Sequence, residues 1–148
     1  MKLLLGQDRA VAEWVCDRIP HVQGAASLGD SVAVGVTDGR QMLAGCVYHN
    51  WCEAYGNIEI TFAAASPRFA TRAVIRDLLA FPFLQWGVRR VSLAVPHDAA
   101  RVVKFVTGIG FVREGCVRHF FANKRHALIF GMLRREFDGM FRSKRTEA

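Results

Sequence analysis

The chain has 148 residues, 51% of them hydrophobic, and a formal net charge of +7. This length and apolar content predict one globular domain, residues 1–148, with a hydrophobic core of its own. Its cysteines lie far apart, with no Cys-x-x-Cys pair and no close cluster with histidine: Cys16, Cys46, Cys52 and Cys116. That spacing predicts neither a metal site nor a disulfide framework, so we expect reduced and mostly buried thiols.

The positive charge predicts a surface that attracts polyanions, although charge alone does not identify the anion. Arginines are spread through the second half of the chain, and the C-terminal segment adds a basic cluster formed by Arg134, Arg135, Arg142, Lys144 and Arg145. Two interpretations stay open. The surface is either solvated, with a site for one phosphorylated small molecule, or it docks nucleic acid.

The first residues resemble a short strand, residues 1–5, whose apolar run ends at Gln7 and Asp8. The run is too short for a signal peptide or a membrane span, so we expect a cytoplasmic protein with no membrane partner. Apolar residues then recur at helical spacing over residues 8–19, with Asp8 placed to cap the helix and Pro20 placed to stop it.

Three antiparallel strands follow in the prediction. Residues 31–36 alternate in polarity, and the Asp38-Gly39 pair is typical of a hairpin turn. Residues 41–51 form the partner strand, and residues 57–65 form the third strand after a polar turn.

The period then becomes helical from Arg68 onward, with Pro82 expected to kink or shorten the helix. A strand over residues 89–95 and a helix over about residues 99–107 come next. Two long strands, residues 111–121 and 126–137, are expected to close the chain around a turn at residues 122–125. A strand–helix–strand crossover after a meander predicts a mixed sheet with helices on its faces, an α/β (α+β) class.

Two sequence motifs carry a family resemblance. Residues 109–118 read Ile-Gly-Phe-Val-Arg-Glu-Gly-Cys-Val-Arg, and residues 130–136 read Phe-Gly-Met-Leu-Arg-Arg-Glu. With the element order, they make roughly residues 31–137 resemble the GNAT family of acyl-CoA-dependent N-acetyltransferases. Within that family the chain looks like the RimJ/RimL branch and its short phage and prophage members. The resemblance implies a mixed, mostly antiparallel sheet of about six to seven strands with a splayed central pair.

The resemblance also implies a cofactor, acetyl-CoA or another acyl-CoA. In this fold the pantetheine arm enters between the splayed strands, and the pyrophosphate lies at the N-terminus of the crossover helix, where unpaired N–H groups favour an anion. The cofactor-binding residues implied here are Phe62, Ala63, Arg68, Phe69, Ala70, Thr71, Arg72 and Ala73.

Thr71 departs from the family pattern, which has glycine at this position. Glycine lets the backbone approach a phosphate closely and adopt positive φ, whereas a β-branched side chain resists both. A threonine hydroxyl can still donate a hydrogen bond to phosphate, and Arg68 and Arg72 add charge-assisted contacts.

Acetyl transfer by direct attack requires a deprotonated amine, and Glu59 is the candidate base. Strand alternation places Glu59 and Thr61 on one face of residues 57–65 and the apolar side chains on the other. Glu59 can equally be an exposed strand glutamate, with Glu53 as a reserve base.

The family's usual acid, a tyrosine, is replaced here by Val106. Either the thiolate leaves with the help of water, or another group supplies the proton. His97 is the nearest titratable candidate because its pKa is naturally close to neutral. A second cluster, formed by His49, Trp51, Cys52 and Tyr55, lies at a meander turn and either grips a substrate or packs there.

The sequence therefore predicts an N-acetyltransferase acting on a protein N-terminus, a lysine or a small-molecule amine. Two alternatives stay open: a phage-type protein that modifies or binds nucleic acid, and a catalytically idle GNAT scaffold. A homodimer is a further alternative, with a surface supplied by phenylalanines of the last hairpin: Phe120, Phe121, Phe130 and Phe137.

Overall fold

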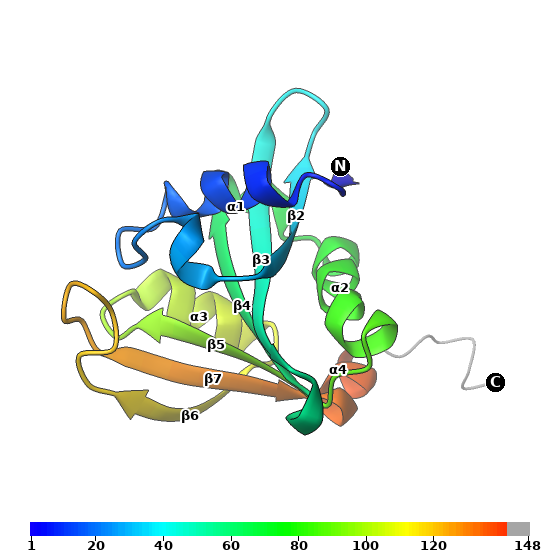
Figure 1. The fold of residues 1–148 in the computed structure, drawn as a ribbon. Coiled ribbons are helices and arrows are strands. Elements are labelled where there is room, and N and C mark those ends of the chain that lie inside the picture. The colour runs from blue at the N-terminus through cyan, green and yellow to red at the C-terminus, as the bar shows by residue number, and fades with distance from the viewer. Residues whose placement is uncertain (142–148) are drawn as a thin grey trace.

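The computed structural model describes residues 1–141, which form a seven-stranded sheet flanked by helices (Figure 1). The elements run β1 (Lys2–Leu4), α1 (Asp8–Cys16), β2 (Ser31–Thr37), β3 (Met42–Cys52), β4 (Asn57–Ala64), α2 (Arg72–Ala80), β5 (Arg90–Pro96), α3 (Ala100–Gly108), β6 (Val112–Val117), β7 (Ala127–Leu133) and α4 (Arg134–Phe141). The basic residues Arg142, Lys144 and Arg145 lie outside the described residues. Within residues 1–141, no helix is both long and apolar enough to cross a membrane.

The strand order is β1-β2-β3-β4-β5-β7-β6, and every neighbouring pair is antiparallel except β4 and β5. That parallel pair is short. It begins at Asn57 and Arg90 and ends where Glu59 lies beside Ser92. Both strands continue past this point without pairing, β4 to Ala64 and β5 to Pro96. The predicted mixed sheet with a splayed central pair and flanking helices is therefore confirmed.

Helices cover the two faces of the sheet unequally. On one face, α1 is the only α-helix of the described residues that packs on strands β2 to β4, with Val11 and Val15 against Val47 and a short turn at Ala25–Leu28 beside it. Gly45 lets this helix approach, because a Cβ there would lie 2.6 Å from Val15. On the other face, α2, α3 and α4 share the main core, represented by Leu79, Val106 and Phe137. The α1 face is left partly uncovered where the end of β3 pairs with the first half of β4, since Asn50 and Trp51 are exposed and Glu59 is half-buried there.

The N-terminal helix begins as predicted but is held differently. Asp8 is its first residue, and its carboxylate accepts a hydrogen bond from the Ala33 N–H of β2 at 3.1 Å instead of capping the helix. The helix ends at Cys16, short of residue 19. The crossover helix α2 also ends early, at Ala80, because Pro82 lies in a π-helical turn that follows it. The predicted shortening by Pro82 is confirmed.

The predicted C-terminal hairpin is wrong in where its two strands end, since both are shorter than expected. β6 stops at Val117, and β7 stops at Leu133, where α4 takes over. The Glu136 carboxylate accepts the Leu133 N–H at 2.8 Å, which stabilises the start of a helix. Helical geometry then places Phe137 against Phe83, with ring centroids 5.1 Å apart.

The four phenylalanines proposed as a dimer surface do not share a surface. Phe130 and Phe137 are only 1% and 2% exposed, because they face the core under β7 and α4. Phe120 is exposed, and Phe121 packs edge-on against His21. That expectation is corrected: β7 and α4 each bury one of these rings in the protein interior.

Candidate active site

A slot opens where β4 and β5 separate. It has a volume of about 280 Å³, and both strands line it, with Thr61 and Phe62 on one side and Leu93 and Ala94 on the other. Residues of β4 beyond Glu59 have no partner on β5, so their backbone groups on this side are available to a ligand. The slot can therefore accept an extended chain that carries amide groups.

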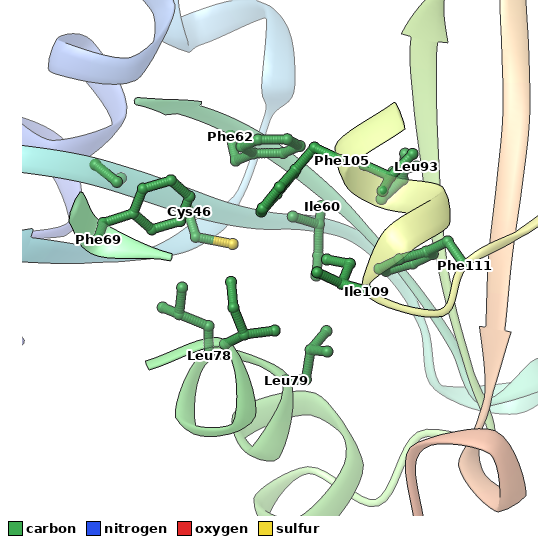
Figure 2. Close-up of a pocket in the computed structure, with 14 residues that line it drawn as sticks. Cys46, Ile60, Phe62, Phe69, Leu78, Leu79, Leu93, Phe105, Ile109 and Phe111 are labelled. Carbon is green, nitrogen blue, oxygen red and sulfur yellow. The ribbon is translucent and has the colours of Figure 1, made fainter. Parts of the chain in front are cut away.

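An apolar cavity of about 50 Å³ adjoins the slot (Figure 2). The Phe105 ring of α3 lies between Phe62 and Phe69, with centroids 5.8 Å from each. Cys46 also lines this cavity, and burial raises the pKa of its thiol to about 12. The thiol stays protonated near neutral pH, so Cys46 is not a nucleophile there.

The turn before α2 accommodates Thr71 without strain. Thr71 has φ −81° and ψ 155°, an extended conformation that does not require glycine. Its hydroxyl accepts the Val74 N–H at 3.2 Å and so caps the helix. The N–H groups of Arg72 and Ala73 make no hydrogen bond within the described part of the chain. This helix start therefore presents two free donors that can bind an anion.

Two arginines flank this turn, and each is held from a different direction. Arg68 pairs with Asp38 of the β2–β3 hairpin at 3.1 Å. The pKa of Asp38 is lowered to about 2, mainly by hydrogen bonds from the Gln41 and Arg40 N–H groups and also by Arg68. Arg72 donates to the Met140 carbonyl at the end of α4. Of the two, Arg68 keeps its side chain largely exposed and can turn to a phosphate.

The polar face of β4 adjoins the slot. Glu59 and Thr61 are half-buried on it, whereas the neighbouring Ile58 and Ile60 are buried in the core, as alternation predicts. Across β3, His49 pairs directly with Glu59 and lies within 2.8 Å of Thr61, between its Nε2 and the threonine Oγ1. Burial lowers the pKa of His49, and the Glu59 carboxylate opposes that shift. The structure thus brings Glu59, Thr61 and His49 together.

A hydrogen-bonded chain continues from this face across β5 to β6. The Ser92 hydroxyl donates to the Asn57 side chain at 2.8 Å, and Arg90 donates to Ser92 at 3.0 Å. Arg90 also makes two hydrogen bonds to Glu114 and thereby lowers the pKa of that carboxyl. A Cβ at Gly131 would lie 2.5 Å from Glu114. In this chain, Glu114 and Gly131 of the two family motifs therefore serve to fix the strands around the slot.

The other candidates for catalysis lie apart from Glu59. His97 follows β5, and its ring packs against His126, with centroids 5.1 Å apart. It is five residues beyond Ser92, the neighbour of Glu59, which corresponds to about 16 Å of extended strand. Val106 is fully buried in the core, and Glu53 is exposed in the turn before β4.

His49 is the site residue whose position sequence reasoning missed. The predicted strand over residues 41–51 contains His49, but the sequence groups it with Trp51 and Tyr55 at the turn and does not indicate that it lies opposite Glu59. The signal that could have indicated this pairing is the distance in sequence of His49 and Glu59 from the turn that joins β3 and β4. The register shifts between His49 and Cys52, however, and such a shift is not encoded in strand periodicity.

Comparisons with known proteins give matches among solved structures alone. No family model and no curated protein matches the chain. Among 273 matching chains of solved structures, a chimera of the Vibrio cholerae spermidine N-acetyltransferase SpeG and hSSAT (K23-Y30) has a TM-score of 0.71 at 14% identity, covering 92% of this chain and 97% of that one. A second such chimera (K23-Q34) has a TM-score of 0.64 at 14% identity, covering 75% and 72%.

A probable acetyltransferase has a TM-score of 0.60 at 19% identity over 72% of this chain, which spans 63% of that protein. At such identities the likeness is one of fold. The expected RimJ/RimL branch and phage origin stay predictions. The strand order, the splayed β4–β5 pair and these structural matches show that the chain has the GNAT fold.

Proposed function

We propose that this protein is an N-acetyltransferase that transfers an acetyl group from acetyl-CoA to an amine by direct attack. The single observation that carries the proposal is the early end of the parallel ladder at Glu59 and Ser92. It opens a slot between β4 and β5 and leaves a carboxylate at the slot's edge. In this proposal the thioester of acetyl-CoA and the Glu59 carboxylate come together at the point where β4 and β5 separate.

The cofactor is proposed to lie along the slot. Its pantetheine amides pair with the backbone of Phe62 and Ala63, beyond the last β4–β5 pair. Its pyrophosphate lies at the start of α2, on the N–H groups of Arg72 and Ala73. Arg68 exchanges its ion pair with Asp38 for a phosphate oxygen.

The reaction proposed at the slot is addition and elimination at the thioester. Glu59 attracts the protonated amine, whose proton passes to the group formed by Glu59, Thr61 and His49. The amine nitrogen then attacks the carbonyl carbon, so that a C–N bond forms, the C–S bond breaks and CoA leaves as a thiolate. Since Val106 offers no hydroxyl, water helps the thiolate leave. His97 follows Pro96 of the slot wall but lies about 16 Å of strand beyond Ser92, so its proposed role is to return a proton to the thiolate through water.

The acceptor is proposed to be an amine, and small-molecule amines are the first to test. The matching SpeG structures are named as spermidine N-acetyltransferases, which supports this choice. The open part of the α1 face leaves Glu59 and Thr61 half-buried and reachable. A protein N-terminus and a lysine side chain are the other proposed acceptors.

Isothermal titration with acetyl-CoA tests the proposal, followed by a thiol-release assay with a panel of amines. Ala94→Trp fills the slot and should abolish the binding heat, whereas Val32→Trp, at an exposed position of β2, should leave it unchanged. The absence of heat from the unmodified protein at millimolar acetyl-CoA would contradict the acetyltransferase. A nucleic-acid gel shift that is lost at modest salt, without acetyl transfer, would instead favour the nucleic-acid binder.

A further inference from the structure

A buried histidine in the middle of the sheet is not fully satisfied. His49 is 5% exposed, and its Nδ1 has no hydrogen-bond partner among the described residues. Buried polar groups in proteins are nearly always paired with protein or water, so an unpaired ring nitrogen needs a reason. A group that exchanges protons during turnover is one such reason.

The imidazole stands between two cavities. Its Nε2 lies 2.8 Å from the Thr61 hydroxyl, and Thr61 lines the slot between β4 and β5. His49 itself lines a separate groove of about 550 Å³ at the start of β2, together with Asp30, Trp51 and Trp86. Together with Thr61, His49 therefore links the reaction slot to the groove.

The charges around His49 suit reversible protonation. On β4, the Glu59 carboxylate lies directly across the strand pair, and Asp30 lies in the loop that borders the groove. Its β2 neighbour, Ser31, is uncharged. Burial keeps the ring neutral in the resting state, while Glu59 stabilises the protonated form. A base needs both properties, because it must start unprotonated and then hold a proton.

On the basis of the proposed acetyl transfer, we propose that His49 takes up the proton of the acceptor ammonium through Thr61 and releases it to the groove. In this step the ammonium N–H bond breaks as an O–H bond forms at Thr61 Oγ1. The original hydroxyl proton of Thr61 passes to His49 Nε2, and the free amine attacks the thioester. The imidazolium then gives one proton to water that reaches it from the groove that His49 lines, which restores the neutral ring.

Three variants test this relay: His49→Gln, Thr61→Val and Thr61→Ser. Gln and Val each break the proton path and should lower kcat about 100-fold with KM for the amine changed less than about threefold. Thr61→Ser restores a hydroxyl and should keep kcat within about threefold of the unmodified protein. A merely structural role for Thr61 would not separate serine from valine in this way.

The pH profile gives a second readout. The unmodified protein should lose kcat below the pKa of His49, and His49→Gln should lose that acid limb. Glu59→Gln removes the charge that raises the pKa, so its acid limb should move to lower pH. Titration of the His49 ring nitrogens by NMR should show the same shift without turnover.

The outcomes separate this inference from the proposed function. An unmodified protein that neither binds acetyl-CoA nor transfers acetyl overturns both. An active protein whose His49→Gln variant binds acetyl-CoA and keeps kcat and the acid limb overturns the relay alone. Equal losses in Thr61→Ser and Thr61→Val also overturn it.

Discussion

The two faces of strand β4 have different roles, although their residues alternate along a single strand. Ile58 and Ile60 lie in the main core under α2 and α3. Glu59 and Thr61 point to the opposite face, where His49 is their neighbour on β3. The core face is closed by three helices, whereas α1 covers part of the polar face.

This difference shows how the fold keeps stability separate from chemistry. Apolar burial on one face positions the backbone, and the strand's alternation then delivers polar groups to the other face at fixed spacing. Substitutions on the core face should change the free energy of unfolding, and substitutions on the polar face should change rates. Single substitutions on each face test that division.

Ile58→Ala should have the largest effect. Ile58 is 3% exposed, and removing a buried aliphatic side chain costs about 2–5 kcal/mol through lost burial and the cavity left behind. Urea denaturation should show the loss as a lower midpoint. The remaining folded protein should keep the KM of the unmodified protein for acetyl-CoA. An unchanged midpoint would mean that the core face does not carry the stability of β4.

Glu59→Gln, one residue away, should give the reverse pattern. The substitution keeps the shape and removes the charge, so kcat should fall about 100-fold, or about 2.7 kcal/mol of transition-state stabilisation. The free energy of unfolding should change by less than about 0.5 kcal/mol, as at most sites outside the core. Activity that survives this variant from pH 6 to 9 would remove Glu59 from the mechanism.

Tyr48→Phe probes the core face of the next strand, β3, where Tyr48 pairs with Ile60. Its buried hydroxyl donates to the Leu78 carbonyl of α2 at 2.6 Å. The variant leaves that carbonyl without its partner and should destabilise the protein by about 1–2 kcal/mol. Acetyl-transfer rates should stay unchanged. Thermal unfolding together with the thiol-release assay checks both halves of this expectation.

Much of the fold could be predicted from sequence because local signals agreed. The Asp38-Gly39 turn fixed the first hairpin, and alternation correctly assigned the faces of Glu59 and Ile60. The last strand was harder. The apolar residues of this segment fit the core either as a strand or as a helix, and the helix from Arg134 is stabilised by the hydrogen bond from the Leu133 N–H to Glu136 and by packing of Phe137 on Phe83.

The candidate site was harder to predict from the sequence than the fold. A bulge after His49 sets which β3 residue faces Glu59, and periodicity carries no information about such a shift. The chain through Arg90 and Glu114 joins residues from separate strands, which sequence spacing does not bring together. Thr71 stands where the resemblance implies glycine, and it fits because the backbone of the turn is extended, which the sequence pattern does not show.

The smallest effect is expected where β4 ends and the phosphate turn begins. Arg68→Ala should raise KM for acetyl-CoA about fivefold, close to 1 kcal/mol, with kcat unchanged, because an exposed charge contributes modestly to binding. Arg76→Ala, on the exposed side of α2, is the matched control and should have no effect.

Asp38→Asn complements the Arg68→Ala test because it removes the charge of the ion-pair partner and keeps Arg68 itself. The amide oxygen can still accept the Arg40 and Gln41 N–H groups of the turn, but the charge that competes with phosphate is gone. KM for acetyl-CoA should therefore fall. Because the pKa of Asp38 is about 2, the carboxylate stays charged throughout the assay range, and the difference between the two proteins should not vary from pH 5 to 8. A KM that rises in Asp38→Asn would mean that the ion pair holds Arg68 in its binding position rather than away from it, and the phosphate turn would then be rigid before the cofactor arrives.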